Sequence, residues 1–310
     1  MNYSLRPETV EALRGKVVCV TGSAGFLGRH FKAVLHEAGC AQVYCMDPND
    51  SGLDATKPED WVSHDWHEAP TFDYIIHAAG IASPFHYRAK PLQALDAAVV
   101  GVRNAIDYAE RNGSTLLFLS SSEIYGDPLV VPTPETYRSH VETMGDRACY
   151  DVSKCLGETL IHLAAERGVK ANVVRIFNSF GPGMSDDDRR FMPNLRRAKR
   201  LGDQLKIYGT GRQTRTFCFV SDTIRGCLQA LTYRAAFGRA WNIGAQGPEL
   251  SMPQIASMAE VPFDLVPYPP EWPGDGEPNR RCPDISRARA ELNFEPIVPF
   301  KEGLRVFLGT

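Results

Sequence analysis

The sequence lacks the patterns that define metal-binding, disulfide-rich, secreted or membrane-spanning proteins. None of its eight cysteines forms a Cys-x-x-Cys pair, and its eight histidines do not cluster at metal-ligand spacing. We therefore expect neither a disulfide framework nor a bound metal. No apolar run is long enough to cross a bilayer, and the first eight residues lack the basic-then-apolar pattern of a secretion signal. These absences favour a cytoplasmic protein with reduced thiols and no membrane partner.

An excess of charge of either sign is also missing. The chain has 34 Lys and Arg against 37 Asp and Glu, so no global field attracts nucleic acid. The basic stretch from Arg189 to Arg200 follows Asp186–Asp188, which is typical of a solvated helix face. The sequence has no internal repeat or low-complexity tract. At 310 residues, 43% of them hydrophobic, it can form an ample core in about two domains.

A glycine-rich loop follows the first apolar run. Gly22, Gly25 and Gly28 come directly after Val17–Thr21, and Phe26 and Leu27 begin an apparent helix. The first glycine permits a tight turn, the second lets backbone approach a diphosphate, and the third lets the helix pack on the strand. The N–H groups at the start of that helix face the anion. Because strand, turn and helix occur in this order, we expect a dinucleotide site.

Asp47 ends the second apparent strand, 42–47, about 20 residues after the glycines. A carboxylate there accepts hydrogen bonds from a ribose 2′-OH and repels a 2′-phosphate. No arginine follows it directly, so NAD is favoured over NADP. The alternative is that Asp47 is an ordinary turn residue before Pro48.

Apparent strands and helices alternate along the first half of the chain. Strands are expected at 73–77, 116–120 and 171–177, and helices at 91–112 and about 150–167. This alternation predicts an α/β fold with a Rossmann-type doubly wound parallel sheet. Segments 215–220 and 240–244 are expected to return to this sheet as strands. We therefore expect a dinucleotide-binding domain of residues 1–177 plus about 216–245, and a smaller substrate-binding lobe of about 178–215 plus 246–310.

One tyrosine–lysine pair has catalytic spacing. Of the eleven tyrosines, only Tyr150 has a lysine four residues later, Lys154. That spacing places both side chains on one helix face, where the ammonium is expected to lower the pKa of the phenol. The phenol then serves as a base toward a sugar hydroxyl. Ser121 lies in a serine run after an apparent strand, where its hydroxyl can bridge the phenol and the substrate.

These motifs together resemble the extended short-chain dehydrogenases/reductases of the nucleotide-sugar type, which include NAD-dependent epimerases and dehydratases. The resemblance covers nearly the whole chain. Within that family, the chain is most similar to the UDP-glucuronate decarboxylases, also called UDP-xylose synthases. Long blocks carry this similarity: 82–87, 120–128, 147–151, 175–182, 208–215 and 281–284. Gly183 departs from the pattern, since the decarboxylases usually have an arginine there.

The resemblance implies a transient oxidation at C4 of a nucleotide sugar, followed by loss of carbon dioxide from C5 and return of the hydride from NADH. It assigns catalysis to Tyr150, Lys154, Ser121, Ser122, Glu123 and Arg215, with Arg215 near the sugar carboxylate. NAD is expected to contact Gly22, Gly25, Phe26, Leu27, Gly28, Asp47, Asp65, Ala79, Tyr150 and Lys154. The nucleotide sugar is expected to contact Tyr87, Asn178, Arg190, Asn194, Tyr208, Gln213, Arg215 and Arg281, the last at the diphosphate. A homodimer through the helices 91–112 and 150–167 is also implied.

Two alternatives stay open at this point. The chain could act on another nucleotide sugar as a C4 dehydrogenase, an epimerase or a 4,6-dehydratase. Dehydration is disfavoured because Ser122 stands where the dehydratases have an aspartic acid. A non-catalytic NAD-binding regulator is less favoured, since such proteins often lose the tyrosine–lysine pair that is present here.

Overall fold

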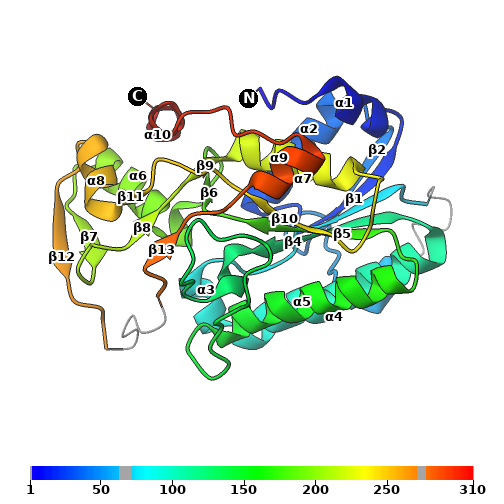
Figure 1. Ribbon diagram of the computed structural model, residues 1–310, viewed down its shortest axis with the longest axis horizontal. Helices are drawn as coiled ribbons and strands as arrows, with labels where there is room; N and C mark the ends of the chain where they lie inside the picture. Colours follow the sequence, from blue (N-terminus) through cyan, green and yellow to red (C-terminus); the bar gives the residue numbers. More distant parts are fainter. Residues whose placement is uncertain (1, 63–70, 271–276, 310) are drawn as a thin grey trace.

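The computed structural model describes residues 2–62, 71–270 and 277–309 (Figure 1). Asp65, expected near the adenine, lies outside these residues. Within them, six strands form one sheet in the order β10-β5-β4-β3-β1-β2, with every neighbouring pair parallel. The strands are β1 (Val17–Thr21), β2 (Gln42–Met46), β3 (Tyr74–His77), β4 (Thr115–Ser121), β5 (Ala171–Ile176) and β10 (Ala240–Ile243). The predicted doubly wound α/β fold is confirmed.

Helices cover both faces of this sheet. On one face α4 and α5 lie side by side against β3, β4 and β5, and on the other α2 and α7 pack together (Figure 1). The helices of this part of the chain are α1 (Pro7–Leu13), α2 (Phe26–Glu37), α3 (Pro84–Ala89), α4 (Pro91–Asn112), α5 (Ala148–Glu166), α7 (Val220–Thr232) and α9 (Ser286–Leu292). Because both faces are covered, the strands are continuous apolar runs rather than alternating ones: all five residues of β1 are buried.

The remaining elements include two-stranded and three-stranded sheets, and most of them lie beyond one end of the main sheet (Figure 1). Within the described residues, β12 pairs with β7, β6 pairs with β9, and β8 lies between β11 and β13. The strands are β6 (Ser179–Phe180), β7 (Leu205–Tyr208), β8 (Thr214–Arg215), β9 (Cys218–Phe219), β11 (Leu250–Ser251), β12 (Phe263–Val266) and β13 (Arg280–Arg281). The helices are α6 (Phe191–Leu201), α8 (Met252–Met258) and α10 (Phe300–Leu308).

The prediction that 215–220 returns to the main sheet is wrong. Arg215 ends β8 in the three-stranded sheet, β9 pairs with β6, and Val220 already begins α7. The position beside β5 is filled by β10, as expected for 240–244. The apolar character of this segment has another cause: Phe217 and Phe219 pack edge-on against Phe180, with ring centroids 5.9 and 5.6 Å apart.

Candidate active site

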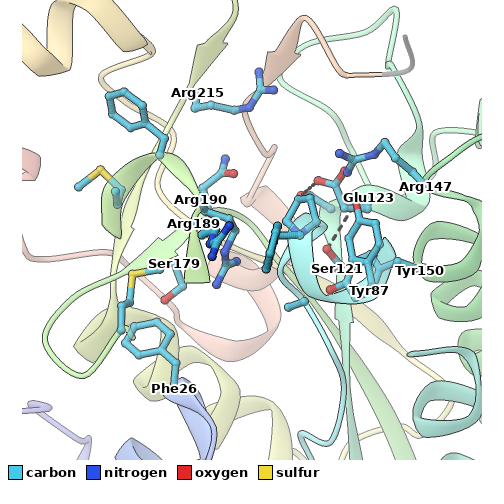
Figure 2. A pocket seen from close by; sticks show the side chains of 18 of the residues that line it. Phe26, Tyr87, Ser121, Glu123, Arg147, Tyr150, Ser179, Arg189, Arg190 and Arg215 are labelled. Atoms are coloured by element: carbon cyan, nitrogen blue, oxygen red, sulfur yellow. Dashed lines mark hydrogen bonds and ion pairs between the residues drawn. The ribbon is translucent and has the colours of Figure 1, made fainter. Parts of the chain in front are cut away.

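A cavity of about 1080 Å³ opens at the carboxyl ends of β1, β4 and β5, where an α/β sheet binds its ligands. One side is formed by the glycine-rich loop and the other by α6, β7 and the segments around β8. Tyr87, Ser121, Glu123, Arg147 and Tyr150 gather on one side of it (Figure 2). The cavity thus brings the glycine loop together with the tyrosine–lysine pair, as the sequence predicts.

The glycine loop leaves no room for side chains. Gly22 has φ +68°, and a Cβ on it would lie 2.7 Å from the nitrogen of Ala79. A Cβ on Gly28 would overlap the Gly22 carbonyl and come within 2.7 Å of Ser23 Cα. α2 begins directly after Gly25, and Gly22, Gly25, Phe26, Leu27 and Gly28 all line the cavity. This narrow cradle at a helix N-terminus fits the diphosphate of a dinucleotide.

Two other residues expected at the cofactor lie beside this loop, outside the cavity lining. Asp47 is 9% exposed, and its carboxylate accepts hydrogen bonds from the backbone N–H groups of Ala24 at 3.3 Å and Asn49 at 2.9 Å. Ala79 donates its backbone N–H to Thr21 Oγ1 at 3.1 Å, which fixes the turn after β3 against β1. Asp47 therefore braces the glycine loop directly.

Tyr150 lies in a closely packed aromatic setting. Its ring stacks on Tyr87 with centroids 5.3 Å apart and an interplanar angle of 8°. Both residues line the cavity, and Tyr87 Oη is buried with no hydrogen-bond partner in the described protein. Burial raises the pKa of Tyr150 to about 12, a hydrogen bond with Ser121 lowers it, and the charge of Glu123 raises it further. Ser121 thus meets the phenol as the sequence analysis expects.

Lys154 lines the cavity beside Tyr150. Its Nζ donates to the Leu119 carbonyl at 2.8 Å and lies 5.8 Å from the centroid of the Tyr150 ring. Burial lowers the pKa of Lys154 to about 8, while the charge of Glu158 raises it. Burial raises the pKa of Tyr150 in the protein alone, so a lowering of that pKa by the Lys154 ammonium stays a prediction.

Glu123 is the centre of a buried ion-pair cluster. Its carboxylate pairs with Arg147 and, at 3.2 Å, with Arg281, and it accepts from Ser122 Oγ at 3.3 Å. Burial raises the pKa of Glu123, but the charges of Arg281 and Arg147 outweigh it and hold that pKa well below its usual range. Glu123 is therefore ionised at neutral pH.

Arg281 is not placed where the sequence analysis expects it. Its side chain is 2% exposed, lies outside the cavity lining, and donates to Glu123 and to the Gly126 carbonyl. Arg281 therefore contacts Glu123 from outside the cavity and does not project into the cavity toward a diphosphate. Ion pairing with a carboxylate 158 residues away gives no local sequence signal.

Arg215 lines the cavity and points its guanidinium at carbonyl oxygens of a neighbouring segment. It donates to Pro278 at 2.7 Å, Thr214 at 2.8 Å and Asn279 at 3.3 Å, and none of the ion pairs found among the described residues includes it. Burial and the charge of Arg281 lower the pKa of Arg215 to about 10. Because burial disfavours the charged guanidinium of Arg215, a bound anion would stabilise it.

The other substrate residues named from the sequence also line the cavity. Tyr208 stacks near Tyr268 with centroids 5.7 Å apart, and Gln213 Nε2 donates to the Tyr208 carbonyl at 3.2 Å. Arg190 is held by Asp188 in a two-pronged contact of 2.5 and 2.6 Å. Asn178, at φ +36°, donates to the Thr216 carbonyl at 2.9 Å, and Asn194 donates to the Arg189 carbonyl at 2.8 Å.

Among the cavity residues that the sequence analysis missed are Arg147, Tyr268 and Glu277. Arg147 precedes α5 and bridges Glu123 to Glu277, which lies 2.8 Å from its Nη1. The only available signal was that Arg147 begins one of the resemblance blocks. Tyr268 and Glu277 lie in a proline-rich segment without periodicity, so only the folded chain brings them to the site.

Two kinds of feature are absent from the described residues. Residues 2–62, 71–270 and 277–309 contain no group of three His, Cys, Asp or Glu side chains that could hold a metal ion. In the same part of the chain, no helix has the length and apolar character needed to span a membrane.

Comparisons with known proteins agree with this geometry. Residues 18–244 match the NAD dependent epimerase/dehydratase family. The chain is 35% identical to UDP-glucuronic acid decarboxylase 1 of Xenopus tropicalis, covering 93% of this chain and 70% of that protein. It is 32% identical to UDP-glucuronic acid decarboxylase 3 of Arabidopsis thaliana, covering 98% and 93%.

A solved structure shares the fold. UDP-glucose 4-epimerase of Thermotoga maritima, solved with UDP-glucose, superposes with a TM-score of 0.84 at 23% identity, covering 94% of this chain and 97% of that one. The match to the family spans more than half of the chain, and the curated relatives are aligned over nearly all of it. The chain therefore belongs to the NAD dependent epimerase/dehydratase family.

Proposed function

We propose that the chain is an NAD-dependent lyase that decarboxylates UDP-glucuronate to UDP-xylose. The observation that carries this proposal is the similarity, over 93% of the chain, to a UDP-glucuronic acid decarboxylase. Two features of the cavity support it. Tyr150 and Ser121 form a hydrogen-bonded pair that can receive a ring hydroxyl, and Arg215 is a buried cation able to receive the sugar carboxylate.

The first step oxidises the C4 hydroxyl. The glycine loop at the start of α2 would hold the diphosphate of NAD, and Asp47, Tyr150 and Lys154 would hold its two nucleoside ends. When bound, NAD⁺ supplies a hydride acceptor for C4 and a positive charge that favours the phenolate. Tyr150 takes the hydroxyl proton, and Ser121 orients that hydroxyl between itself and the phenol. Burial excludes competing water from this proton transfer.

The second step breaks the bond between C5 and the carboxylate. A ketone at C4 makes the sugar a β-keto acid, so the electron pair left by carbon dioxide enters an enolate. Arg215 would orient the departing carboxylate, and Ser122 and Glu123 would act on decarboxylation and on reprotonation at C5. Ionised Glu123 is a hydrogen-bond acceptor that directs the Ser122 hydroxyl. After C5 is protonated, Tyr150 returns its proton as C4 is reduced, so the cycle is redox-neutral.

The decisive experiment incubates the purified protein with UDP-glucuronate and NAD⁺ and measures carbon dioxide and UDP-xylose. Stoichiometric release of both, without net NADH, supports the proposal. A 4-epimer, a 4-keto-6-deoxy sugar or accumulating NADH would instead identify the epimerase, dehydratase or dehydrogenase. Binding of NAD without turnover of any nucleotide sugar would favour the regulator.

We also propose a cytoplasmic homodimer assembled through α4 and α5. In support, four leucines on these two helices expose a third or more of their surface: Leu92, Leu95, Leu156 and Leu163. The eight cysteines are free, which suits a reducing compartment.

We propose further that residues 1–177 with about 216–245 form the NAD domain and that the rest forms the sugar lobe. This division is supported by the six-stranded sheet, because all six of its strands come from the residues assigned to the NAD domain.

A further inference from the structure

A buried ion pair lies behind the catalytic face of α5. Glu158 is one helical turn beyond Lys154, and its side chain is 14% exposed. Glu158 Oε1 accepts from Ser120 Oγ at 2.6 Å and from Arg175 Nε at 3.0 Å, and Oε2 accepts from Arg175 Nη2 at 2.7 Å. None of these three side chains has a part in the proposed reaction.

The pair continues into a network that extends from α5 to the chain following β13. Arg175 Nη1 donates to Tyr125 Oη at 2.8 Å, and Tyr125 Oη donates to Asn242 Oδ1 at 2.7 Å. Asn242 Nδ2 in turn donates to the carbonyls of Thr133 and Asp284, each at 2.9 Å. The network therefore joins α5, the ends of β4, β5 and β10, and the chain just after Arg281.

Two successive residues of β4 form hydrogen bonds with side chains on successive turns of α5. Lys154 Nζ donates to the Leu119 carbonyl at 2.8 Å, and Ser120 Oγ donates to Glu158 at 2.6 Å. The next residue of β4 is Ser121, which meets Tyr150. A slip of α5 along β4 would break both contacts and separate the serine from the phenol.

We propose that Glu158 is a positioning residue that, with Arg175 and Ser120, fixes α5 against the end of β4 and so sets the catalytic placement of Tyr150 and Lys154. This inference rests on the proposed roles of that tyrosine and lysine. Stability alone is a weak reason for such a pair, because the desolvation of two buried charges offsets much of their attraction. A hydrogen-bonded fork of fixed geometry instead specifies one arrangement of strand and helix.

Glu158 also sets the charge near Lys154. The ionisable groups that face Lys154 are Tyr150 and Glu158 on α5 and His77 on β3. Burial lowers the pKa of His77 to about 4, so that ring is neutral, and burial keeps the Tyr150 phenol protonated near pH 7. The charge of Glu158 raises the pKa of Lys154 and so favours its protonated form.

The test compares Glu158→Gln with Glu166→Gln. Glu166 is on the same helix but 62% exposed, and it pairs with His162 at 3.4 Å. Titration of ¹³C-lysine-labelled protein by NMR, with Lys154→Met to assign the signal, reports the pKa of Lys154 without substrate. We expect Glu158→Gln to lower that pKa by about one pH unit and Glu166→Gln to leave it unchanged.

In the decarboxylation assay we expect Glu158→Gln to lower kcat about 10-fold, with KM for UDP-glucuronate and the affinity for NAD unchanged, because misplacement affects the transition state. The alkaline limb of the kcat profile should move to lower pH. An unchanged Lys154 titration together with an unchanged kcat overturns the proposal. Absence of carbon dioxide release by the wild type refutes the proposed function instead, and the NMR titration still tests Glu158.

Ser120→Ala is the second variant, for use if Glu158→Gln does not fold. It removes one hydrogen bond and leaves the Glu158–Arg175 pair intact. We expect a lower kcat at unchanged KM, and Ser120→Thr, which restores the hydroxyl, should recover most of the rate. Equal kcat in Ser120→Ala and the wild type would contradict the positioning role.

Discussion

Burial shifts three ionisable side chains of the cavity away from their solution behaviour. It raises the pKa of Tyr150 to about 12, lowers that of Lys154 to about 8 and, with the charge of Arg281, lowers that of Arg215 to about 10. Each shift disfavours the charged form in the protein alone. Bound ligands that bring positive charge to the phenol and negative charge to the arginine would reverse the first and third shifts.

Replacing Tyr150 by Phe tests the proton transfer. The variant loses the phenolic oxygen but keeps the ring that stacks on Tyr87 at 5.3 Å, so the fold and NAD binding should survive. We expect kcat for carbon dioxide release to fall about 10³-fold, the range of general acid–base catalysis. Fluorescence titration with NAD⁺ provides the control. Undiminished turnover would eliminate Tyr150 as the base.

Replacing Glu123 by Gln tests the buried ion-pair cluster. The change leaves Arg281, 2% exposed, without its carboxylate partner, so we expect the free energy of unfolding at pH 7 to fall by about 3 kcal/mol. The matched control is Glu249→Gln. Glu249 pairs at 2.6 Å with Arg280, whose side chain is 53% exposed, so that change should cost less than about 1 kcal/mol.

The loss of stability caused by Glu123→Gln should depend on pH. Because the pKa of Glu123 is lower in the folded protein than in the unfolded chain, its stabilisation is complete above the unfolded pKa of about 4.3 and is lost as the pH falls through the folded value. Urea unfolding should therefore show a smaller difference between wild type and Glu123→Gln at pH 3 than at pH 7. Equal differences at the two values would show that Glu123 is not ionised in the folded state.

Helices and strands with a clear periodicity or an apolar run could be predicted from the sequence. α4 occupies 91–112 as expected, and β1 and β2 are found where their apolar residues place them. α7 was missed although its polar residues 222, 225, 229 and 232 recur at helical spacing, because the apolar residues 217–220 before it were interpreted as a strand. The sequence could not show that this polar face is covered in the fold, where Asp222 and Arg225 form a buried ion pair 2.7 Å apart.

The turn between β1 and α2 offers a test of an element junction. An added methyl at Gly28 would overlap the Gly22 carbonyl, so Gly28→Ala must push α2 away from β1. We expect a loss of about 1–3 kcal/mol of stability and a loss of NAD affinity, measured by urea unfolding and by calorimetry. Gly247→Ala is the control, because Gly247 lies outside the cavity lining and its added methyl would meet nothing within 4 Å. Wild-type NAD affinity in Gly28→Ala would contradict the role assigned to this loop.

The complete site is a property of the whole chain. The sequence indicated the glycine loop and the tyrosine–lysine pair because each is a local motif. Arg147, Glu277 and Arg281 could not be assigned in this way. Arg147 and Arg281 pair with Glu123, and Glu277 pairs with Arg147, so the cluster joins residues up to 158 positions apart in the sequence. Spacing along the chain has no bearing on such contacts, since tertiary packing alone sets them.

Assembly of two copies is the last property to test. α4 and α5 lie side by side on one outer layer, where Leu92 is 74% and Leu163 is 46% exposed (Figure 1). If these helices form the proposed dimer interface, a charge placed there will be buried without a partner on association. We expect Leu163→Lys to shift the protein from dimer to monomer in sedimentation velocity while its circular dichroism stays unchanged. The matched control is Val306→Lys on α10, where Val306 is 43% exposed. Should both lysine variants sediment as the wild type does, the interface lies elsewhere; should the wild type already sediment as a monomer, the dimer proposal fails.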